Sequence, residues 1–323
     1  MQEIFSMDQE FFLAPELPVI VIGGSGVDLI GRLEKELVPG TKNPAKIRTS
    51  YGGVARNIAE NLSRLGQRTI LLTAVGEDYA GKQLLAQSVQ AGVDISRVRT
   101  TSDHPTGTYL GILDEKGTLQ FALDDINATK SLTPDYIRSH ADLFKQASLV
   151  FIDANLPAKT LRTIFSQARR ARIPVCADPT STSLAKHLEP FLDRLSLITP
   201  NGDEAGVLCG LTIENNQPQD AIEAAKCLVS KGVGIVLVSL AEFGVVYATS
   251  ETSGYVPAIR TSVVDPTGAG DALNATVIYA LLHQIPLDDA VRLGVTAASI
   301  TLRHRGTVVD DLSLELLYDQ LVI

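Results

Sequence analysis

Short apolar runs rich in β-branched residues alternate along the chain with longer amphipathic stretches, and this alternation limits the folds that the chain can adopt. The runs that predict strands are residues 19–23, 69–75, 149–153, 174–177, 195–199 and 235–239. The stretches with a helical period are residues 54–65, 81–91, 158–171 and 221–231. Strands that alternate with helices form parallel sheets with helices packed on both faces. The sequence therefore predicts an α/β fold whose ligands bind beyond the carboxyl ends of the strands.

Two regions break the alternation and predict a small antiparallel sheet. In the first, residues 30–37 pair with residues 46–51, and in the second, residues 107–113 pair with residues 119–123. The second pair is joined by Asp-Glu-Lys-Gly at positions 114–117, which is a turn sequence. We therefore expect strands from about residues 30–51 and 107–124 to form a unit of their own.

The composition is that of one large domain. With 323 residues, of which 45% are hydrophobic, the chain can bury a large core. A formal net charge of -9 argues against nucleic acid or an anionic membrane as a partner. Cys176, Cys209 and Cys227 lack metal-ligand spacing, and no apolar run approaches the roughly 20 residues of a transmembrane helix. We expect a cytoplasmic protein with an N-terminal extension over residues 1–17 and a single domain over residues 18–323.

The segment Asp-Pro-Thr-Gly-Ala-Gly-Asp-Ala at residues 265–272 sets small residues directly before an apolar stretch that predicts a helix. The first turn of a helix has N–H groups without intrahelical partners, and the helix dipole adds positive potential there. Gly268, Ala269 and Gly270 can therefore present bare amides to a phosphate. Asp271 would repel that phosphate unless it takes the proton of an attacking hydroxyl. The alternative is a plain loop into a helix, with Asp271 as a first-turn acid.

A second segment, GGVARNIAENLSRLGQRTILLTAVG, begins at Gly52 and ends at Gly76. It carries a glycine pair, then Asn57, and then Gly66 at the seventh position after Ala59. Together, the two segments resemble the paired signatures of the PfkB family of carbohydrate and nucleoside kinases, also called the ribokinase family. The resemblance covers most of the chain, and it makes the phosphoryl-transfer interpretation the better one.

This resemblance implies a fold, a reaction and cofactors. The fold would be a ribokinase-like three-layer sandwich with a mostly parallel central sheet, and the hairpins would form a small β-sheet lid. The reaction would transfer the γ-phosphoryl group of ATP, with Mg2+, to a sugar or nucleoside. Asp271 would be the catalytic base, and the amides of Gly268, Ala269 and Gly270 would hold the phosphoryl group. Lid strands often pair across dimers in this family, so a homodimer is a reasonable expectation.

The resemblance assigns the acceptor site to the N-terminal half. Asp28 lies just past the first predicted strand, where the family places an acid, and a carboxylate suits two vicinal hydroxyls that each donate a hydrogen bond. Gly52 and Gly53 would let the backbone approach the substrate, and Asn57 would donate to and accept from a hydroxyl. The alternatives are that Asp28 and the glycines belong to turns and that Asn57 is an ordinary first-turn helix residue.

The resemblance assigns ATP and Mg2+ to the C-terminal half. Asn201 and Glu204 resemble the family's Asn-x-x-Glu element, in which Glu204 would hold Mg2+ largely through water and Asn201 would lie near the phosphates. The alternative is a helix N-terminus with acids in its first turn. Ser239 and Gly244 belong to a turn that resembles the nucleotide-binding turn, and Ala298 belongs to a late helix that lines the adenine slot in the family.

Asp265 is also expected to hold a metal. Together with the Thr267 carbonyl and Gly306, it resembles part of the monovalent-cation site of ribokinase-like members. The ion implied there is K+.

Three features bear on the acceptor. Arg56, residues 43–47 and residues 124–127 resemble family members that phosphorylate pseudouridine rather than ribose or fructose. Pseudouridine presents an N1–H where uridine has a C–H, so a selective pocket needs an acceptor there, and Asp125 is our first choice. The alternatives are that Arg56 pairs with an acid on its own helix and that the lid acids form a solvated strand end.

We therefore expect a kinase for the 5′-hydroxyl of a nucleoside, with pseudouridine as the foremost acceptor. The first alternative is a ribokinase or another sugar or nucleoside kinase of the family. A more distant alternative is a non-catalytic sensor that binds a nucleoside or a sugar.

Overall fold

The computed structural model describes residues 14–214 and 217–321, and within them the chain folds around an eight-stranded sheet of order β14-β13-β12-β11-β10-β9-β1-β4. The strands of this central sheet are β1 (Val19–Ile22), β4 (Thr69–Leu72), β9 (Leu149–Asp153), β10 (Val175–Asp178), β11 (Leu197–Ile198), β12 (Ile235–Ser239), β13 (Val245–Ala248) and β14 (Ser253–Val256). Neighbours from β4 to β12 are parallel, and β13 and β14 add antiparallel strands at one edge. The predicted mostly parallel sheet is confirmed.

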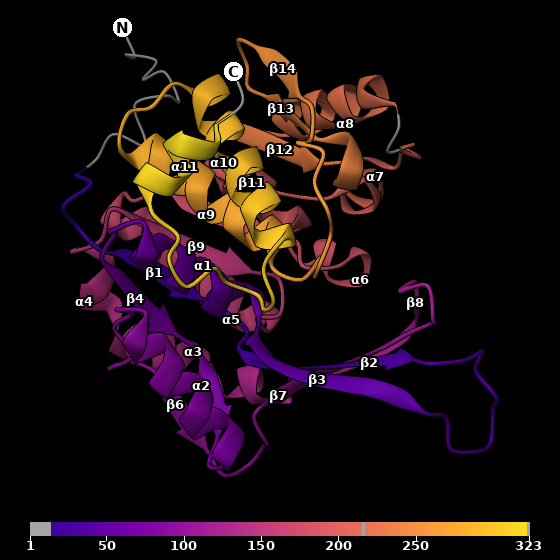
Figure 1. Cartoon of the computed structure of the whole chain (residues 1–323). Helices are drawn as coiled ribbons and strands as arrows, with labels where there is room; N and C mark the ends of the chain where they lie inside the picture. The colour runs from indigo at the N-terminus through magenta and orange to yellow at the C-terminus, as the bar shows by residue number, and fades with distance from the viewer. Residues whose placement is uncertain (1–13, 215–216, 322–323) are drawn as a thin grey trace, which may run out of the picture.

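Helices cover both faces of the central sheet, which is therefore the middle of three layers (Figure 1). In β1, Val19 and Val21 pack in one core with α1, α9 and α10, whereas Ile20 and Ile22 pack in a second core with α5 and α8. Burial on both faces explains why β1 is apolar at all four positions. The helices are α1 (Val54–Arg64), α2 (Tyr79–Gln90), α3 (Pro134–Ser139), α4 (Ala141–Phe144), α5 (Ala158–Ala171), α6 (Thr182–Ala185), α7 (Gly202–Cys209), α8 (Pro218–Ser230), α9 (Ala269–Leu282), α10 (Leu287–Leu302) and α11 (Leu314–Gln320), with 3-10 turns at η2 (Asn127–Ser131), η3 (Glu189–Arg194) and η4 (Ala241–Phe243).

The two hairpin regions form one four-stranded sheet of order β3-β2-β7-β8, which we call the lid sheet. Its strands are β2 (Gly26–Leu33), β3 (Ala45–Gly52), β7 (Gly107–Leu113) and β8 (Leu119–Asp125). The β2–β3 and β7–β8 pairs are antiparallel, and β2 and β7 pair in parallel. Figure 1 shows this sheet extending from the body as a long arm. Its first strand begins at Gly26 rather than at about residue 30, so Asp28 lies inside a lid strand.

The run at residues 69–75 is split between two sheets. The first part is β4 of the central sheet, whereas β5 (Ala74–Gly76) pairs with β6 (Arg99–Thr101). Between the two parts, the Thr73 hydroxyl donates to the Gly23 carbonyl at 2.7 Å and accepts from the Ser25 hydroxyl at 2.8 Å. These bonds fix the loop after β1, which leads into the lid strand of Asp28.

The predicted N-terminal extension, residues 1–17, falls mostly outside the described residues. Its last residues run along the body, where the Gln67 side chain donates to the carbonyls of Pro15 and Leu17 at 3.1 and 2.8 Å. None of the described helices combines the length and the apolar character needed to cross a membrane.

Candidate active site

The two glycine-rich segments of the sequence meet where α1 and α9 begin. Gly53 precedes the first residue of α1, and Gly268 precedes the first residue of α9. The two helices pack against each other. Near their first turns, the Asn57 Nδ2 atom donates a hydrogen bond to Asp271 Oδ2 over 2.7 Å. Residues from both segments therefore belong to one site.

Asp271 lies in the first turn of α9 with a partly buried side chain. Loss of solvation raises the pKa of its carboxyl to about 7, and the negative charges of Asp28 and Asp153 act in the same direction. The hydrogen bond from Asn57 opposes this rise. A base works best when its pKa lies near the working pH, so this carboxyl suits proton transfer at neutral pH.

The amides of residues 269–271 form the open end of α9. The Ala272 N–H makes the first backbone bond of the helix, to the Gly268 carbonyl, and the three preceding N–H groups have no acceptor among the described residues. Gly268 has a φ of 83°, and a Cβ there would lie 2.0 Å from the Thr307 carbonyl oxygen, so the fold itself requires glycine. A Cβ on Gly270 would meet nothing within 4 Å. The space above Gly270 is therefore open, and an anion is favoured there.

Asp28 is 8% exposed in β2 and lies against Gly52, the last residue of β3. A Cβ on Gly52 would lie 2.1 Å from Asp28 Oδ2, and a Cβ on Gly53, whose φ is 95°, would lie 2.6 Å from a carbonyl of the loop after β1. Burial raises the pKa of Asp28 to about 6 against the positive charge of Arg56. Gly52 thus makes room for the Asp28 carboxylate, and Gly53 makes room for the loop after β1. The Asp28 carboxylate lies close enough to Asp271 to raise the pKa of that group.

Arg56 is 4% exposed and pairs with Glu60 on its own helix at 2.6 Å. Its Nη1 donates to Asn57 Oδ1 and to Thr307 Oγ1, each at 3.1 Å. The guanidinium therefore orients the Asn57 amide whose Nδ2 binds Asp271. This geometry matches the alternative of an acid partner on the same helix and favours a positioning role, and a direct contact with substrate stays a prediction.

A cavity of about 670 Å³ brings together the residues expected to bind ATP. They come from four separate elements, and the cavity also reaches Gly270 of the open helix end. Its apolar walls include side chains that the sequence did not single out, namely Ile259, Leu273, Val295 and Leu302. A volume of this size suits a nucleotide-sized ligand. The expected nucleotide residues that line it are Asn201, Ser239, Gly244 and Ala298.

The turn from Ser239 to Gly244 contains two residues with a positive φ. Ala241 adopts a φ of 49°. Gly244 has a φ of 115°, and a Cβ there would lie 2.3 Å from the Val256 carbonyl oxygen. The turn thus keeps a left-handed backbone at position 241 with alanine, at the cost that such a conformation carries for any residue with a Cβ.

Asn201 and Glu204 form a reciprocal capping box at the start of α7. The Glu204 N–H donates to Asn201 Oδ1, and the Asn201 N–H donates to Glu204 Oε2, each at 2.9 Å. Glu204 is buried, and burial raises the pKa of its carboxyl. Burial raises the pKa of the nearby Asp178 carboxyl well above its usual value, and the charge of Glu204 raises it further. The helix-capping account of this segment is therefore observed, and the role of Glu204 in holding Mg2+ stays a prediction.

Four lid residues lie in one row across the strands. Ser50, Asp28, Tyr109 and Asp124 are cross-strand partners, and partners in register share one face of a sheet. Burial and the charges of Asp28 and Asp124 raise the pKa of Tyr109, so the three groups are close. Asp125 is the next residue of the strand and therefore lies on the opposite face of the sheet. Its Oδ1 accepts from the N–H and the Nδ2 of Asn127 at 3.1 and 2.7 Å. The strand register thus sets Asp124, and not Asp125, on the face of Asp28.

Asp265 is 2% exposed and forms an ion pair with Arg48 of β3 at 2.7 Å. Its other oxygen, Oδ1, accepts from the Thr267 N–H at 3.0 Å. Asp265 and Gly306, two members of the expected monovalent-cation site, line a common groove with Arg48.

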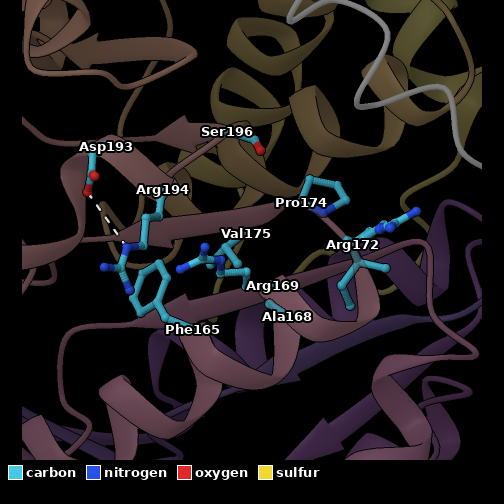
Figure 2. A pocket seen from close by; sticks show the side chains of 10 residues that line it. Phe165, Ala168, Arg169, Arg172, Pro174, Val175, Asp193, Arg194 and Ser196 are labelled. Atoms are coloured by element: carbon cyan, nitrogen blue, oxygen red, sulfur yellow. Dashed lines mark ion pairs between the residues drawn. The ribbon is translucent and has the colours of Figure 1, made fainter. Parts of the chain in front are cut away.

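A further cavity of about 510 Å³ lies at the opposite end of the strands. Figure 2 shows its lining residues around the start of β10, with Arg169, Arg172 and Arg194 among them. The exposed Arg169 and Arg172 lie at the carboxyl end of α5, where basic residues complement the helix dipole. This cavity holds none of the residues of the site at α9.

Two acids of the site were missed by the sequence reasoning. Asp153 and Asp178 are the last residues of β9 and β10 and are partners across those strands. Asp153 is fully buried and accepts from the N–H groups of Gly24 and Ala55 at 2.7 and 3.3 Å, which ties the loop after β1 to the start of α1. An acid at the carboxyl end of a buried parallel strand is the signal that could have identified both.

Comparisons with known proteins agree with this geometry. Residues 18–313 match the family described as pfkB family carbohydrate kinase. The pseudouridine kinase of Escherichia coli (strain K12) is 32% identical over 297 residues, which are 92% of this chain and 94% of that protein. The guanosine-inosine kinase of Exiguobacterium acetylicum is 29% identical over 283 residues, which are 87% and 93% of the two chains. The solved structure of Arabidopsis thaliana ribokinase with ribose and ATP matches with a TM-score of 0.78 at 24% identity and covers 93% of this chain and 98% of its own.

The chain belongs to the PfkB family of carbohydrate kinases and has a ribokinase-like fold. It is a kinase of the sugar and nucleoside class, a phosphotransferase with an alcohol group as acceptor.

Proposed function

We propose that the protein transfers the γ-phosphoryl group of ATP to the 5′-hydroxyl of a nucleoside and that pseudouridine is its preferred acceptor. The main support for this reaction is the Asn57–Asp271 hydrogen bond at the open end of α9. It orients a base within the same helical turn that offers free N–H groups to an anion. The choice of pseudouridine is supported by the likeness to the Escherichia coli enzyme and by the polar row on the lid sheet.

In this proposal, Asp271 takes the proton of the 5′-hydroxyl as that oxygen bonds to the γ-phosphorus, and ADP leaves with the electron pair of the broken bond. Asp28 accepts hydrogen bonds from two ribose hydroxyls, and this contact orients the sugar toward Asp271. The amides of residues 269–271 stabilise the charge on the phosphoryl oxygens. Asn57 holds the Asp271 carboxylate in place between turnovers.

Asp178 and Glu204 would hold Mg2+ beside the ATP phosphates. The donor set fits the ion, because burial raises the pKa of both carboxyls and the charge of Glu204 raises that of Asp178 further. A divalent cation would offset this cost of ionisation. Among the described residues, no group of three or more His, Cys, Asp or Glu side chains could hold a metal ion by itself. That fits an ion that keeps several waters and binds the phosphates. When bound, Mg2+ supplies charge neutralisation on the transferred group.

Asp124 is the lid residue that we assign to the base edge of the nucleoside, in place of our first choice Asp125. Partial burial and the neighbouring charge of Asp125 raise the pKa of Asp124, and the Asp124 side chain lies on the face that carries Asp28 and Tyr109. The carboxylate can accept the N1–H of pseudouridine, whereas uridine would leave it desolvated without a partner. The Tyr109 ring can pack on the base beside it.

A panel of acceptors with Mg-ATP tests the proposal. We expect phosphorylation of pseudouridine with a higher kcat/KM than of uridine, guanosine, inosine or ribose, and a product that carries the phosphate on the 5′-oxygen. A clear preference for ribose would instead establish the ribokinase alternative. Acceptor binding by calorimetry without any ATP consumption would establish the sensor alternative, which the acids at positions 204 and 271 argue against.

We further propose a homodimer that forms through the lid sheet, in the cytoplasm where ATP is available. The lid face opposite Asp28 exposes large apolar side chains, with Ile47 at 74%, Phe121 at 46% and Leu123 at 61% exposure. Exposed apolar patches of this kind often mark interaction surfaces. Light scattering should give twice the chain mass, and Phe121→Lys should return the mass to that of one chain.

A further inference from the structure

Arg48 reaches from the lid sheet to the last part of the loop that leads from β14 into α9. Its Nη1 atom lies 2.7 Å from Asp265 Oδ2, and the side chain of Asp265 is 2% exposed whereas that of Arg48 is 39% exposed. Asp265 Oδ1 accepts from the Thr267 N–H at 3.0 Å. Both carboxylate oxygens of this buried acid therefore have a partner within the chain.

The groove beside Asp265 has one more basic than acidic side chain. It holds about 690 Å³, and its charged lining residues are Arg48, Arg56, Arg64, Arg305, Glu60, Asp265 and Asp310. Arg305 is exposed, and it forms no ion pair within residues 14–214 and 217–321. A cation that approached Asp265 from this groove would meet Arg48, which already holds the carboxylate, and the exposed Arg305, both of its own sign.

These observations disagree with the K+ that the fold family implies at Asp265, the Thr267 carbonyl and Gly306. A cation is useful there only while the buried Asp265 carboxylate lacks a counter-charge, and Arg48 already supplies one over 2.7 Å. We propose that the Arg48 guanidinium supplies the positive charge for the loop at residues 265–268 and that the protein takes up no K+ at Asp265.

The proposal gives Arg48 a positioning role. The guanidinium belongs to β3 of the lid sheet, and its partner Asp265 lies shortly before the open first turn of α9, which contains Asp271. One ion pair thus links the position of the lid to the position of the anion site. Arginine suits this link because its planar group keeps its charge and holds a fixed orientation toward a carboxylate.

Thermal unfolding in KCl and in tetramethylammonium chloride of equal ionic strength tests the proposal without any catalysis. The variants are Arg48→Gln, which removes the charge, and Arg48→Lys, which keeps it. The matched control is Arg32→Gln, because Arg32 lies on the same lid face, is exposed and donates to the Glu115 carbonyl at 2.7 Å, away from Asp265.

Wild type, Arg48→Lys and Arg32→Gln should each unfold at the same temperature in both salts. The Tm of Arg48→Gln should be lower in tetramethylammonium and should rise with the K+ concentration, because an ion that binds only the native state stabilises it by mass action. A wild-type Tm that rises with K+ overturns the proposal, and so does an Arg48→Gln Tm equal to that of wild type in tetramethylammonium. If Arg48→Gln does not fold, the wild-type and Arg48→Lys comparison still decides.

The rates give a second readout, which rests on the proposed kinase function. Wild-type kcat/KM should be the same in both salts, and Arg48→Gln should lower it on the order of 10- to 100-fold in tetramethylammonium, the scale expected for a displaced anion site. K+ should restore part of the Arg48→Gln rate and leave the wild-type rate unchanged. A wild-type rate that needs K+ would contradict the role of Arg48. A protein that phosphorylates no acceptor in either salt would instead contradict the proposed function, and the unfolding data would still test Arg48.

Discussion

The Asn57 side-chain amide lies 2.7 Å from the Asp271 carboxylate and joins two residues that are 214 positions apart in the chain. The orientation of that amide is fixed from the other side, because Asn57 Oδ1 accepts from Arg56. A donated hydrogen bond stabilises the charged carboxylate, whereas burial disfavours it, and burial dominates in raising the pKa to about 7. The pair therefore sets the pH above which the site can accept a proton.

We expect Asn57→Ala to move the acid limb of the pH profile to higher pH. The substitution removes the one hydrogen bond that lowers the pKa of Asp271, so the base stays protonated over a wider range. The measurement is kcat/KM for the acceptor against pH, with circular dichroism to check the fold. A profile that keeps its wild-type midpoint would mean that Asn57 does not tune the base.

Asp271→Asn should lower kcat by about 10²- to 10⁴-fold while ATP still binds, which is the range for loss of a general base. The same variant carries a stability prediction with a defined sign. The folded pKa of about 7 exceeds the ordinary value, so the stability from the neutral carboxyl is present at low pH and is lost as the pH rises through about 7. Asp271→Asn should therefore unfold at a higher temperature than wild type above about pH 8, and the gain should shrink toward about pH 4. Near-normal turnover would remove Asp271 from the mechanism.

The layers of the fold followed from the sequence because buried parallel strands and amphipathic helices have distinct periods. The same periods could not reveal which strand ends face the site. In the sequence, Asp153 and Asp178 are simply the last residues of two predicted strands. The strand order β10-β9-β1 brings Asp153 to the start of α1 and Asp178 to the first turns of α9.

The lid shows a second limit of the sequence. The strands were predicted, but which face a side chain occupies depends on register, and a shift of one residue inverts it. The sequence pattern favours Asp125 for the base edge, whereas the register makes Asp124 the partner of Tyr109 and Asp125 the partner of Thr108. Which of the two contacts the acceptor stays a prediction. The ion pair of Arg48 with Asp265 joins residues from distant parts of the chain, and no local pattern indicates it.

Glu204→Gln should raise the Mg2+ concentration needed for the half-maximal rate, because the amide keeps the size of the side chain and loses its charge. Glutamine can still accept from the Asn201 N–H, so the capping box and α7 should survive. The control is Glu189→Gln, a first-turn acid of η3 that lies outside the nucleotide cavity. An Mg2+ dependence equal to that of wild type would remove Glu204 from the metal site.

Gly270→Ala and Gly268→Ala should separate a ligand effect from a folding effect. A Cβ at Gly270 meets nothing within 4 Å, so we expect an unchanged Tm with a raised KM for ATP or a lowered kcat, because the methyl group enters the space for the phosphates. A Cβ at Gly268 would collide with the Thr307 carbonyl at a φ of 83°, so that variant should lose stability. Unaltered kinetics of Gly270→Ala would mean that the phosphates lie elsewhere.

Asp124→Ala should reduce the preference for pseudouridine over uridine by harming pseudouridine more. A site built around one substrate hydrogen bond can reject the analogue that lacks it by up to about 10⁴- to 10⁵-fold. The wild-type ratio of kcat/KM for pseudouridine to that for uridine is therefore the largest preference that Asp124→Ala can lose. Asp125→Ala is the matched control, since it removes a neighbouring carboxylate of opposite strand parity whose Oδ1 is already bound to Asn127. The measurement is the ratio of kcat/KM for the two nucleosides in the three proteins. A ratio that falls only in Asp125→Ala would assign recognition of the base edge to Asp125. Equal wild-type kcat/KM values for pseudouridine and uridine would contradict the proposed selectivity and leave the proposed kinase chemistry unaffected.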